Sequence, residues 1–197
     1  EEKNFSRASV DRDINQRPDG EILIKVAYSS LNYKDGLSAI GNRGVTRHYP
    51  HTPGIDACGV IEQSSSEKYR VGDEVIVTSY DLGMNTSGGF SQYIRVPAGW
   101  VVPLPPGLNL RESMILGTAG FTAGMSVDAL TQAVSPDQGD ILVTGATGGV
   151  GSLSVAILAK LGYSVTAVSG KVEAAGFLTS LGATKIISRQ EAMEGHE

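Results

Sequence analysis

Hydrophobic residues follow two different patterns along this chain. Between residues 20 and 107 the apolar runs are short, and the first of them alternates polar and apolar positions as a half-buried strand does. Glycine and proline separate the runs, which is typical of a small β-barrel-like domain. We expect strands at residues 21–28, 59–62, 73–78 and 88–96, and a proline-limited strand at residues 100–105 on a sheet edge.

Beyond residue 108 the pattern favours helices that alternate with strands. Apolar spacing predicts helices at residues 109–117 and 121–134, and a turn at residues 136–140 leads into the next strand. Strands that alternate with helices indicate an α/β domain with a parallel sheet. The elements predicted for it are strand 141–144, helix 152–162, strand 164–168 and a short strand 184–187.

A glycine-rich loop, residues 145–151, joins the first parallel strand to its helix and reads Gly-Ala-Thr-Gly-Gly-Val-Gly. Its spacing matches the dinucleotide motif G-x-G-x-x-G, with Ala146 in the place of the first glycine. Backbone N–H groups and the helix dipole hold a phosphate there, Gly148 lets the pyrophosphate approach, and Gly151 lets the helix pack closely. A glycine-rich turn without a nucleotide is the alternative. The cofactor contacts expected in the loop are Ala146, Thr147, Gly148, Gly149 and Val150.

The end of the second parallel strand bears on which dinucleotide binds. NAD-specific sites carry an acidic residue about 20 residues after the loop, whereas this chain has Ser169, Gly170 and Lys171 there. A cation attracts the 2′-phosphate of NADPH, by about 4 kcal/mol at roughly 4 Å and an effective dielectric of about 20. We therefore predict NADPH. Two alternatives stay open: Lys171 only begins the next helix as a solvated residue, or Glu173 contacts a ribose and NADH binds.

Composition and charge narrow the choice of partners. The 197 residues carry a formal net charge of −5 without a basic run, so neither nucleic acid nor an acidic membrane surface is an expected partner. No apolar stretch reaches the roughly 18–20 residues of a membrane span and no signal peptide opens the chain, so we expect a cytoplasmic protein with a small-molecule substrate. Cys58 is the only cysteine, which excludes an intrachain disulfide. The chain begins without methionine and ends ten residues after the last strand, so we expect a longer protein.

Several motifs together resemble the medium-chain dehydrogenase/reductase superfamily. This resemblance implies a GroES-like barrel, residues 1–112, followed by a doubly wound Rossmann domain of which residues 113–197 form the first half. It also implies a homodimer. Within the superfamily, the sequences N-Y-K-D-G, G-T-A-G-F-T-A and S-G-K are similar to a zinc-free branch of acrylyl-CoA reductases and quinone-oxidoreductase-like proteins. The matching segments are residues 31–36, 53–59, 71–75, 88–93, 117–123 and the glycine loop.

The zinc-binding branch of the superfamily indicates which positions decide the metal chemistry. There the Cys of a C-x-x-D motif and the His of a G-H-E motif bind zinc, and the matching residues here are Asn32 and Ile55. Neither Asn32 nor Ile55 can replace the Cys or His ligand, so the resemblance predicts a site without metal. Binding of a metal in a proline-rich loop is the alternative. Its candidate ligands are His48, His51, Asp56 and Cys58.

Without zinc, the resemblance implies hydride transfer to a conjugated C=C bond, which needs hydrogen-bond donors for the developing enolate oxygen rather than a Lewis acid. Tyr33 is the polar group expected nearest the cofactor, as a proton donor or positioning group, and Asn32 is expected to contact a carbonyl or ribose. The alternative for Tyr33 is aromatic packing at a domain junction. By the same resemblance, Thr118 and Thr122 line the cofactor cleft, and Asp35 caps the turn after Asn32.

Three functions are open at this point. The first is NADPH-dependent reduction of an enoyl thioester or enone, with acrylyl-CoA as the substrate that the resemblance suggests. The second keeps the enzyme class and changes the acceptor to a quinone. The third is a protein that binds NADPH without turnover, as happened with lens crystallins of this superfamily.

Overall fold

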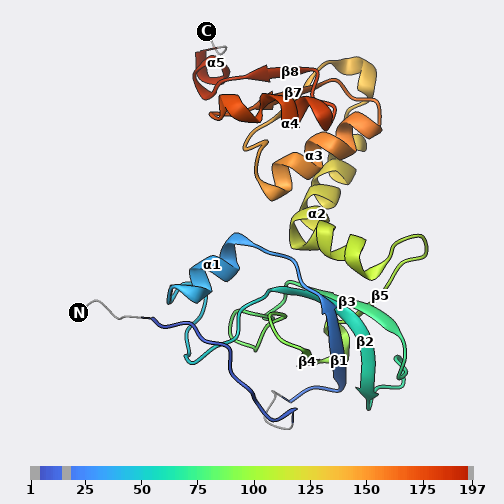
Figure 1. Ribbon diagram of the computed structural model, residues 1–197. Helices are drawn as coiled ribbons and strands as arrows, with labels where there is room; N and C mark the ends of the chain where they lie inside the picture. Colours follow the sequence, from blue (N-terminus) through green and yellow to red (C-terminus); the bar gives the residue numbers. More distant parts are fainter. Residues whose placement is uncertain (1–4, 15–18, 195–197) are drawn as a thin grey trace. The chain divides into compact units, whose positions relative to one another are not determined.

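The computed structural model describes residues 5–14 and 19–194 (Figure 1). The chain divides into two compact units, Glu1–Thr118 and Ala119–Glu197, each with its own hydrophobic core. We expected a division after residue 112, whereas the first unit extends to Thr118. The N–H group of Thr118 donates a hydrogen bond to the carboxylate of Asp56, which ties this segment to the first unit.

An antiparallel sheet forms the frame of the first unit (Figure 1). Its strand order is β4-β1-β2-β3-β5, so β5 lies at the edge that we expected for the proline-limited segment. The strands are β1 (Ile22–Tyr28), β2 (Asp56–Ser64), β3 (Glu74–Thr78), β4 (Tyr93–Val96) and β5 (Val102–Pro103).

Two of these strands differ from the predicted ones. β2 begins three residues before the predicted start at residue 59, because Asp56 and Ala57 pair with Thr78 and Val77 of β3. β4 is shorter than the predicted strand 88–96. The N–H groups of residues 88–90 donate hydrogen bonds to the carbonyls of residues 52–54, so this segment pairs with a loop and not with the sheet.

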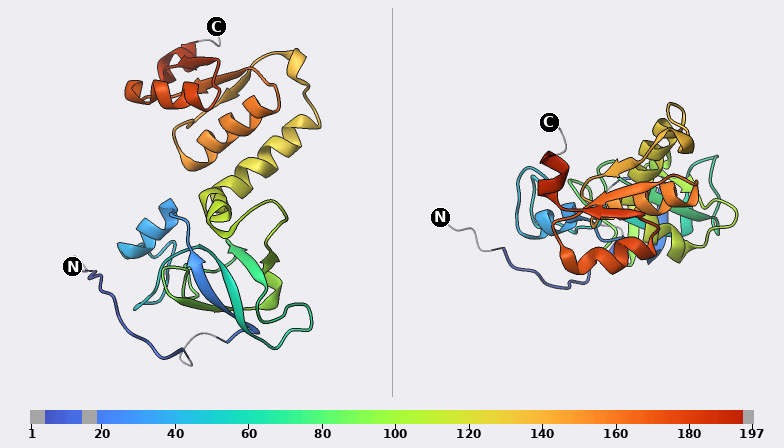
Figure 2. Two further views of the ribbon diagram at one scale, coloured as in Figure 1. Left: turned by 45° about the vertical axis from the view of Figure 1, so that its right-hand side comes forward. Right: turned by 90° about the horizontal axis from the view of Figure 1, so that it is seen from above.

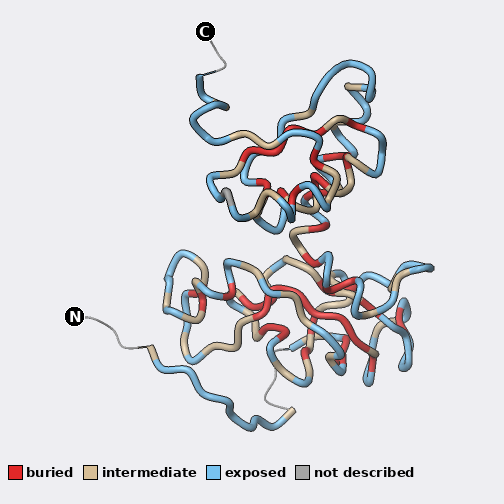
Figure 3. Tube along the Cα trace, turned by 45° about the horizontal axis from the view of Figure 1, so that its top comes forward, coloured by how far each residue is buried: buried red, intermediate tan, exposed pale blue. Residues whose placement is uncertain are grey.

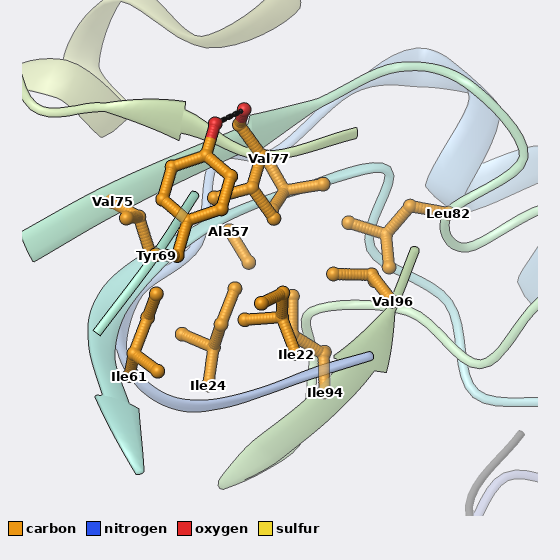
Figure 4. Close-up of a cluster of buried hydrophobic side chains, with 11 residues drawn as sticks. Ile22, Ile24, Ala57, Ile61, Tyr69, Val75, Val77, Leu82, Ile94 and Val96 are labelled. Carbon is orange, nitrogen blue, oxygen red and sulfur yellow. Dashed lines mark hydrogen bonds between the residues drawn. The ribbon is translucent and has the colours of Figure 1, made fainter. Parts of the chain in front are cut away.

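The core of the first unit lies on one face of this sheet, where β-branched and other aliphatic side chains meet (Figure 4). Ile22 and Ile24 point into it, as the alternation in β1 predicts. Leu23 is buried as well, so the start of β1 is covered on both faces and the predicted half-burial is wrong there. Tyr69 enters the core with its hydroxyl group donating to the carbonyl of Val101, which satisfies its polar atom.

A parallel sheet with the order β6-β7-β8 forms the second unit (Figure 2). Helices α3 and α4 connect successive strands, which is the strand–helix–strand order of a Rossmann domain. The predicted α/β class is confirmed, with an antiparallel β domain before a parallel α/β domain. The elements are β6 (Ile141–Val143), α3 (Gly149–Lys160), β7 (Val165–Val168), α4 (Ala175–Ser180), β8 (Lys185–Ile187) and α5 (Arg189–Glu194).

The remaining helices include one that the sequence analysis did not predict. This is α1 (Tyr33–Ala39), which follows β1. Helix α2 (Leu110–Thr131) covers most of both predicted helices but ends three residues before the predicted end at residue 134. The backbone leaves the helical region at Gly117. Short 3₁₀ turns occur at Ala98–Trp100, Pro136–Gln138 and Val172–Ala174.

Buried residues concentrate in the central strands β1, β2 and β7 (Figure 3). All four residues of β7 are buried, and two of them, Val165 and Ala167, share a hydrophobic cluster with side chains of α3 and α4. This is the burial expected of a parallel strand with covered faces. Among the described residues, no helix combines the length and the apolar character needed to cross a membrane.

Candidate cofactor-binding and catalytic residues

The glycine loop ends at the start of α3, where Gly148 is the N-cap residue. No side chain of the described residues caps the first turn, and no acidic residue lies in it. The first helical hydrogen bond runs from Ser152 N–H to the carbonyl of Gly148 at 2.8 Å. The N–H groups before Ser152 therefore point past the start of the helix, at the positive end of its dipole, where an anion binds.

The four glycines of the loop occupy positions that favour glycine for three different structural reasons. Gly145 has a φ of 59°, in the left-handed region that glycine adopts without strain. A Cβ on Gly151 would overlap the carbonyl oxygen of Gly145, so the packing requirement predicted for Gly151 is met by the loop itself. Gly148 and Gly149 are exposed, so an incoming pyrophosphate would meet backbone and no side chain. These features fit a dinucleotide.

The loop residues expected to contact the cofactor are not equally accessible. Gly148, Gly149 and Val150 are exposed and Thr147 is half-buried. Ala146 is fully buried, and its N–H group donates to the carbonyl of Val168 at 3.4 Å. Its backbone N–H group therefore anchors the loop to β7, and its buried methyl group is not on the exposed side of the loop.

The expected 2′-phosphate position is an exposed turn at the carboxyl end of β7. Ser169 N–H donates to the carbonyl of Ile187 in β8, and Lys171 N–H donates to Ser169 Oγ, both at 3.0 Å. The Arg189 side chain also lies at this turn. Its Nε atom would be 3.5 Å from a Cβ atom placed on Gly170. Sequence reasoning missed Arg189, although a cation directly after a third parallel strand is a usable signal.

Among the residues that the structure describes, no carboxylate forms an ion pair with either of the two cations at this turn. Lys25 and Glu62 form the only ion pair of the described residues, and they belong to the first unit. Lys171 and Arg189 are exposed at the ends of β7 and β8. A phosphate at this edge would thus meet two available positive charges and the hydroxyl group of Ser169.

Helix α1 begins directly after β1 and carries the predicted catalytic residues. Asn32 is its N-cap residue and accepts a hydrogen bond from Lys34 N–H at 3.1 Å. Asp35 completes a capping box by accepting from Asn32 N–H at 2.8 Å. Tyr33 is 81% exposed, so its hydroxyl group is open to solvent or a ligand.

Asp35 does more than the capping that the sequence predicted. Its carboxylate is buried, and Oδ1 accepts hydrogen bonds from Gly54 N–H and Ile55 N–H at 2.9 Å each. This joins α1 to the segment that precedes β2. The two positions that match zinc ligands in relatives, Asn32 and Ile55, are therefore held by one carboxylate.

Two of the residues named for the metal-binding alternative, His51 and Cys58, have hydrogen-bond partners in the protein. His51 Nε2 lies 2.9 Å from the carbonyl of Gly83, and Cys58 Sγ lies 3.0 Å from the carbonyl of Leu110. Burial raises the pKa of the Cys58 thiol, which disfavours a thiolate. Within residues 5–14 and 19–194, no three His, Cys, Asp or Glu side chains are grouped as metal ligands.

A buried polar cluster joins Asp56, named above only as a ligand in the metal-binding alternative, to Thr118, which was expected to line the cofactor cleft. Asp56 is 1% exposed and receives two hydrogen bonds from Thr118, from N–H at 2.9 Å and from the hydroxyl group at 2.5 Å. Ser79 Oγ lies 3.0 Å from Thr118 Oγ1. Burial raises the pKa of Asp56, the charge of Asp35 adds to this, and the hydrogen bonds from Thr118 oppose it.

Backbone conformations around this cluster are unusual. Gly117 has φ 52° and ψ −158°, a region essentially restricted to glycine. Ser79 and Tyr80 have φ values of 62° and 50°, although both carry a Cβ.

The other predicted threonine, Thr122, is exposed on α2 in the second unit, and its carbonyl accepts from Ser126 Oγ at 2.8 Å.

Comparison with known proteins identifies relatives of the whole chain. Residues 18–106 match the alcohol dehydrogenase GroES-like domain family. The chain is 50% identical over 196 residues to acrylyl-CoA reductase AcuI of Ruegeria pomeroyi, which covers 98% of this chain and 59% of that protein. It is 51% identical over 179 residues to the putative quinone oxidoreductase YhfP of Bacillus subtilis, with 90% and 54% covered.

Two crystal structures of relatives share the fold. The yhdH oxidoreductase of Salmonella enterica in complex with NADP has a TM-score of 0.90 at 46% identity, over 92% of this chain and 56% of that one. Bacillus subtilis yhfP with NAD bound has a TM-score of 0.90 at 49% identity, over 93% and 56%. The chain spans about half the length of the curated relatives it matches. With its GroES-like domain and partial Rossmann domain, the chain is similar over 90% and 98% of its length to these two members of the medium-chain dehydrogenase/reductase superfamily.

Proposed function

We propose that the full-length protein is an NADPH-dependent oxidoreductase that reduces the activated C=C bond of an enoyl thioester or enone without a catalytic zinc. The observation that carries the proposal is the exposed glycine start of α3, with no side-chain cap and no acidic residue in its first turn. Its relative in Ruegeria pomeroyi is named an acrylyl-CoA reductase, and the Salmonella enterica structure contains NADP. Both support the proposal.

Residues of the second unit would hold the cofactor at its phosphates. The loop N–H groups would bind the pyrophosphate, and Ser169, Lys171 and Arg189 would bind the 2′-phosphate. Bound NADPH supplies the hydride. Because the Bacillus subtilis structure contains NAD, NADH is the competing cofactor, and the cations at the ends of β7 and β8 favour NADPH over it.

The zinc-free chemistry is supported by the residues at two positions. The Ile55 side chain has no atom that can bind a metal, and the Asn32 side chain accepts the hydrogen bond that caps α1. Metal analysis of the purified full-length protein tests this part. The proposal predicts less than one zinc ion in ten protein molecules, and stoichiometric zinc would contradict it.

Residues at the start of α1 would stabilise the charge that develops on the substrate. As a hydride reaches the β-carbon, negative charge moves to the carbonyl oxygen, where a hydrogen-bond donor contributes about 3 kcal/mol in a dry site. The exposed hydroxyl group of Tyr33 is the proposed donor, and the Asn32 amide nitrogen is the second. Thr118 and Thr122 would contact the cofactor.

A steady-state survey of the full-length protein tests the substrate class. NADPH is offered with acrylyl-CoA, crotonyl-CoA, simple enones and quinones, and kcat/KM is compared. The proposal predicts the highest values for the enoyl thioesters. Turnover of quinones alone would contradict it, as would tight NADPH binding without turnover of any acceptor.

Quinone reduction is the second candidate, because the relative in Bacillus subtilis is named a putative quinone oxidoreductase. The same residues would then donate hydrogen bonds to a quinone oxygen, which also gains negative charge on reduction. Assembly as a homodimer and a cytoplasmic location belong to the proposal through the resemblance to the superfamily. Sedimentation of the full-length protein would test the homodimer.

A further inference from the structure

Asp56 and Ser79 have no part in the proposed function so far, and with Thr118 they form one hydrogen-bonded chain. Asp56 opens β2, Ser79 follows β3, and Thr118 follows the break in α2. Thr118 Oγ1 lies 2.5 Å from Asp56 Oδ1 and 3.0 Å from Ser79 Oγ. We propose that Ser79, Thr118 and Asp56 form a proton relay, with Ser79 at its outer end, that supplies the proton for the α-carbon of the substrate.

The relay rests on the proposed function and fills a gap in it. Reduction of a conjugated C=C bond adds a hydride to the β-carbon and a proton to the α-carbon. Tyr33 and Asn32 are assigned to the carbonyl oxygen, so the carbon needs another donor. Ser79 is half-buried, whereas Asp56 is 1% exposed. The hydrogen-bonded relay therefore runs from the interior toward the surface of the unit.

The direction of the hydrogen bonds depends on the proton of Asp56. When Asp56 is ionised, the Thr118 hydroxyl group donates to it and must accept from Ser79. When Asp56 is protonated, it donates to Thr118, Thr118 donates to Ser79, and the Ser79 proton is directed away from the chain. Only the second state can deliver a proton outward.

The backbone around the relay is held in conformations that are unfavourable for ordinary residues. Ser79 and Tyr80 both have positive φ values, and the Tyr80 ring stacks on Trp100 with centroids 5.4 Å apart. A Cβ on Gly117 would overlap Ser30 Oγ and lie 2.9 Å from Asp56 Oδ2. Such conformations gather at functional sites, because the surrounding structure has to maintain them.

The environment of Asp56 favours its protonated form more than water does. Burial raises its pKa, and among the described residues the charged side chain that acts on it is Asp35 of α1, which raises it further. The groups that β3 and α2 present to it are uncharged: the hydroxyl groups of Ser79 and Thr118. Asp56 can thus hold a proton in the resting relay at higher pH than an exposed carboxyl group.

The proton transfer balances with NADPH as the reductant and water as the final proton source. The hydride carries two electrons to the β-carbon, and the π electrons of the C=C bond move onto the α-carbon and the carbonyl oxygen. Ser79 gives its proton to the α-carbon and takes that of Thr118, which takes that of Asp56. The Asp56 carboxylate then takes one proton from water before the next turnover.

The substitution Ser79→Gly separates the relay from a structural role. Glycine suits the positive φ of this residue, so the melting temperature should not fall. The full-length variant is assayed with NADPH and crotonyl-CoA in D₂O, and the configuration of the α-deuterium in butyryl-CoA is determined. The wild type should give one configuration, whereas Ser79→Gly should give a mixture and a kcat at least tenfold lower.

Substitutions at the inner residues distinguish proton transfer from hydrogen bonding. Asp56→Asn can form the same hydrogen bonds but has no proton to give, so it should behave like Ser79→Gly. Thr118→Val breaks the chain and Thr118→Ser restores it, so the serine variant should keep one configuration. The matched control is Thr46→Val, which removes a buried hydroxyl pair with Ser38 outside the relay and should leave kcat and the configuration unchanged.

A titration of the cofactor-free protein gives a readout other than activity. The ¹³C resonance of the Asp56 carboxyl group should report a pKa above the ordinary value, and Thr118→Val should raise the pKa further because the carboxylate loses a donor. An ordinary pKa, or one configuration in both Ser79→Gly and Asp56→Asn, would overturn the relay. Failure of the wild type to oxidise NADPH with crotonyl-CoA would instead overturn the proposed function, and the relay with it.

Discussion

Thr118 makes two hydrogen bonds with Asp56: its N–H group lies 2.9 Å from Oδ2 and its hydroxyl oxygen lies 2.5 Å from Oδ1. The two residues are 62 positions apart, so the pair joins the break in α2 to the start of β2. The backbone at Gly117 has to turn out of the helix for both donors to reach the carboxylate. The stability of the first unit therefore depends on this turn.

Gly117→Ala should destabilise the protein by about 2 kcal/mol or more, because residues with a Cβ are strained in this backbone region. The new Cβ would also overlap Ser30 Oγ. Urea unfolding measures the free energy of unfolding of the variant and the wild type. The matched control is Gly124→Ala in the same helix, where a Cβ meets nothing within 4 Å, and it should stabilise by about 0.5–1 kcal/mol. Equal effects of the two substitutions would contradict this account of Gly117.

The raised pKa of Asp56 predicts a pH dependence of stability. Above the ordinary value of 3.8 the folded protein keeps a proton on Asp56 that the unfolded chain releases, so this contribution is lost as pH rises through the folded-state pKa. Asp56→Asn lacks the contribution. Its free energy of unfolding relative to the wild type should therefore increase with pH across this window. Urea unfolding at several pH values measures the difference, and parallel curves would show that the pKa of Asp56 is the same in both states.

Local patterns explain which parts of the fold were predictable. The strands, the glycine loop and the Ser169–Lys171 turn are each specified by neighbouring residues, and hydrophobic periodicity found them. Asp56 and Thr118 meet only through tertiary packing, and nothing in the sequence near either residue indicates the other. Helix α1 was missed because its capping box uses Asn32 and Asp35 instead of the commoner Ser or Thr with Glu.

The cations at the ends of β7 and β8 predict the cofactor preference. Lys171→Ala and Arg189→Ala should each weaken NADPH binding about tenfold and leave NADH binding nearly unchanged, because only NADPH carries the 2′-phosphate. Isothermal titration measures both dissociation constants. Lys160→Ala, which removes a cation at the other end of α3, should change neither. Equal weakening for both cofactors would place the two cations outside the 2′-phosphate site.

Tyr33→Phe removes the hydroxyl group proposed to donate to the substrate oxygen and keeps the ring. It should lower kcat with crotonyl-CoA by tenfold or more, since a lost donor of this kind is worth about 3 kcal/mol. The exposure of Tyr33 predicts an unchanged melting temperature. A variant kcat equal to that of the wild type would show that the Tyr33 hydroxyl group has no part in catalysis.

The transfer of hydride from NADPH to the β-carbon is the central claim. It is tested most directly with NADPH deuterated at the C4 position that donates the hydride, acrylyl-CoA as the acceptor and the full-length protein as the catalyst. Mass spectrometry and NMR of the product should locate one deuterium on the β-carbon of propionyl-CoA. Consumption of NADPH with no deuterium in propionyl-CoA, or no consumption at all, would contradict the account.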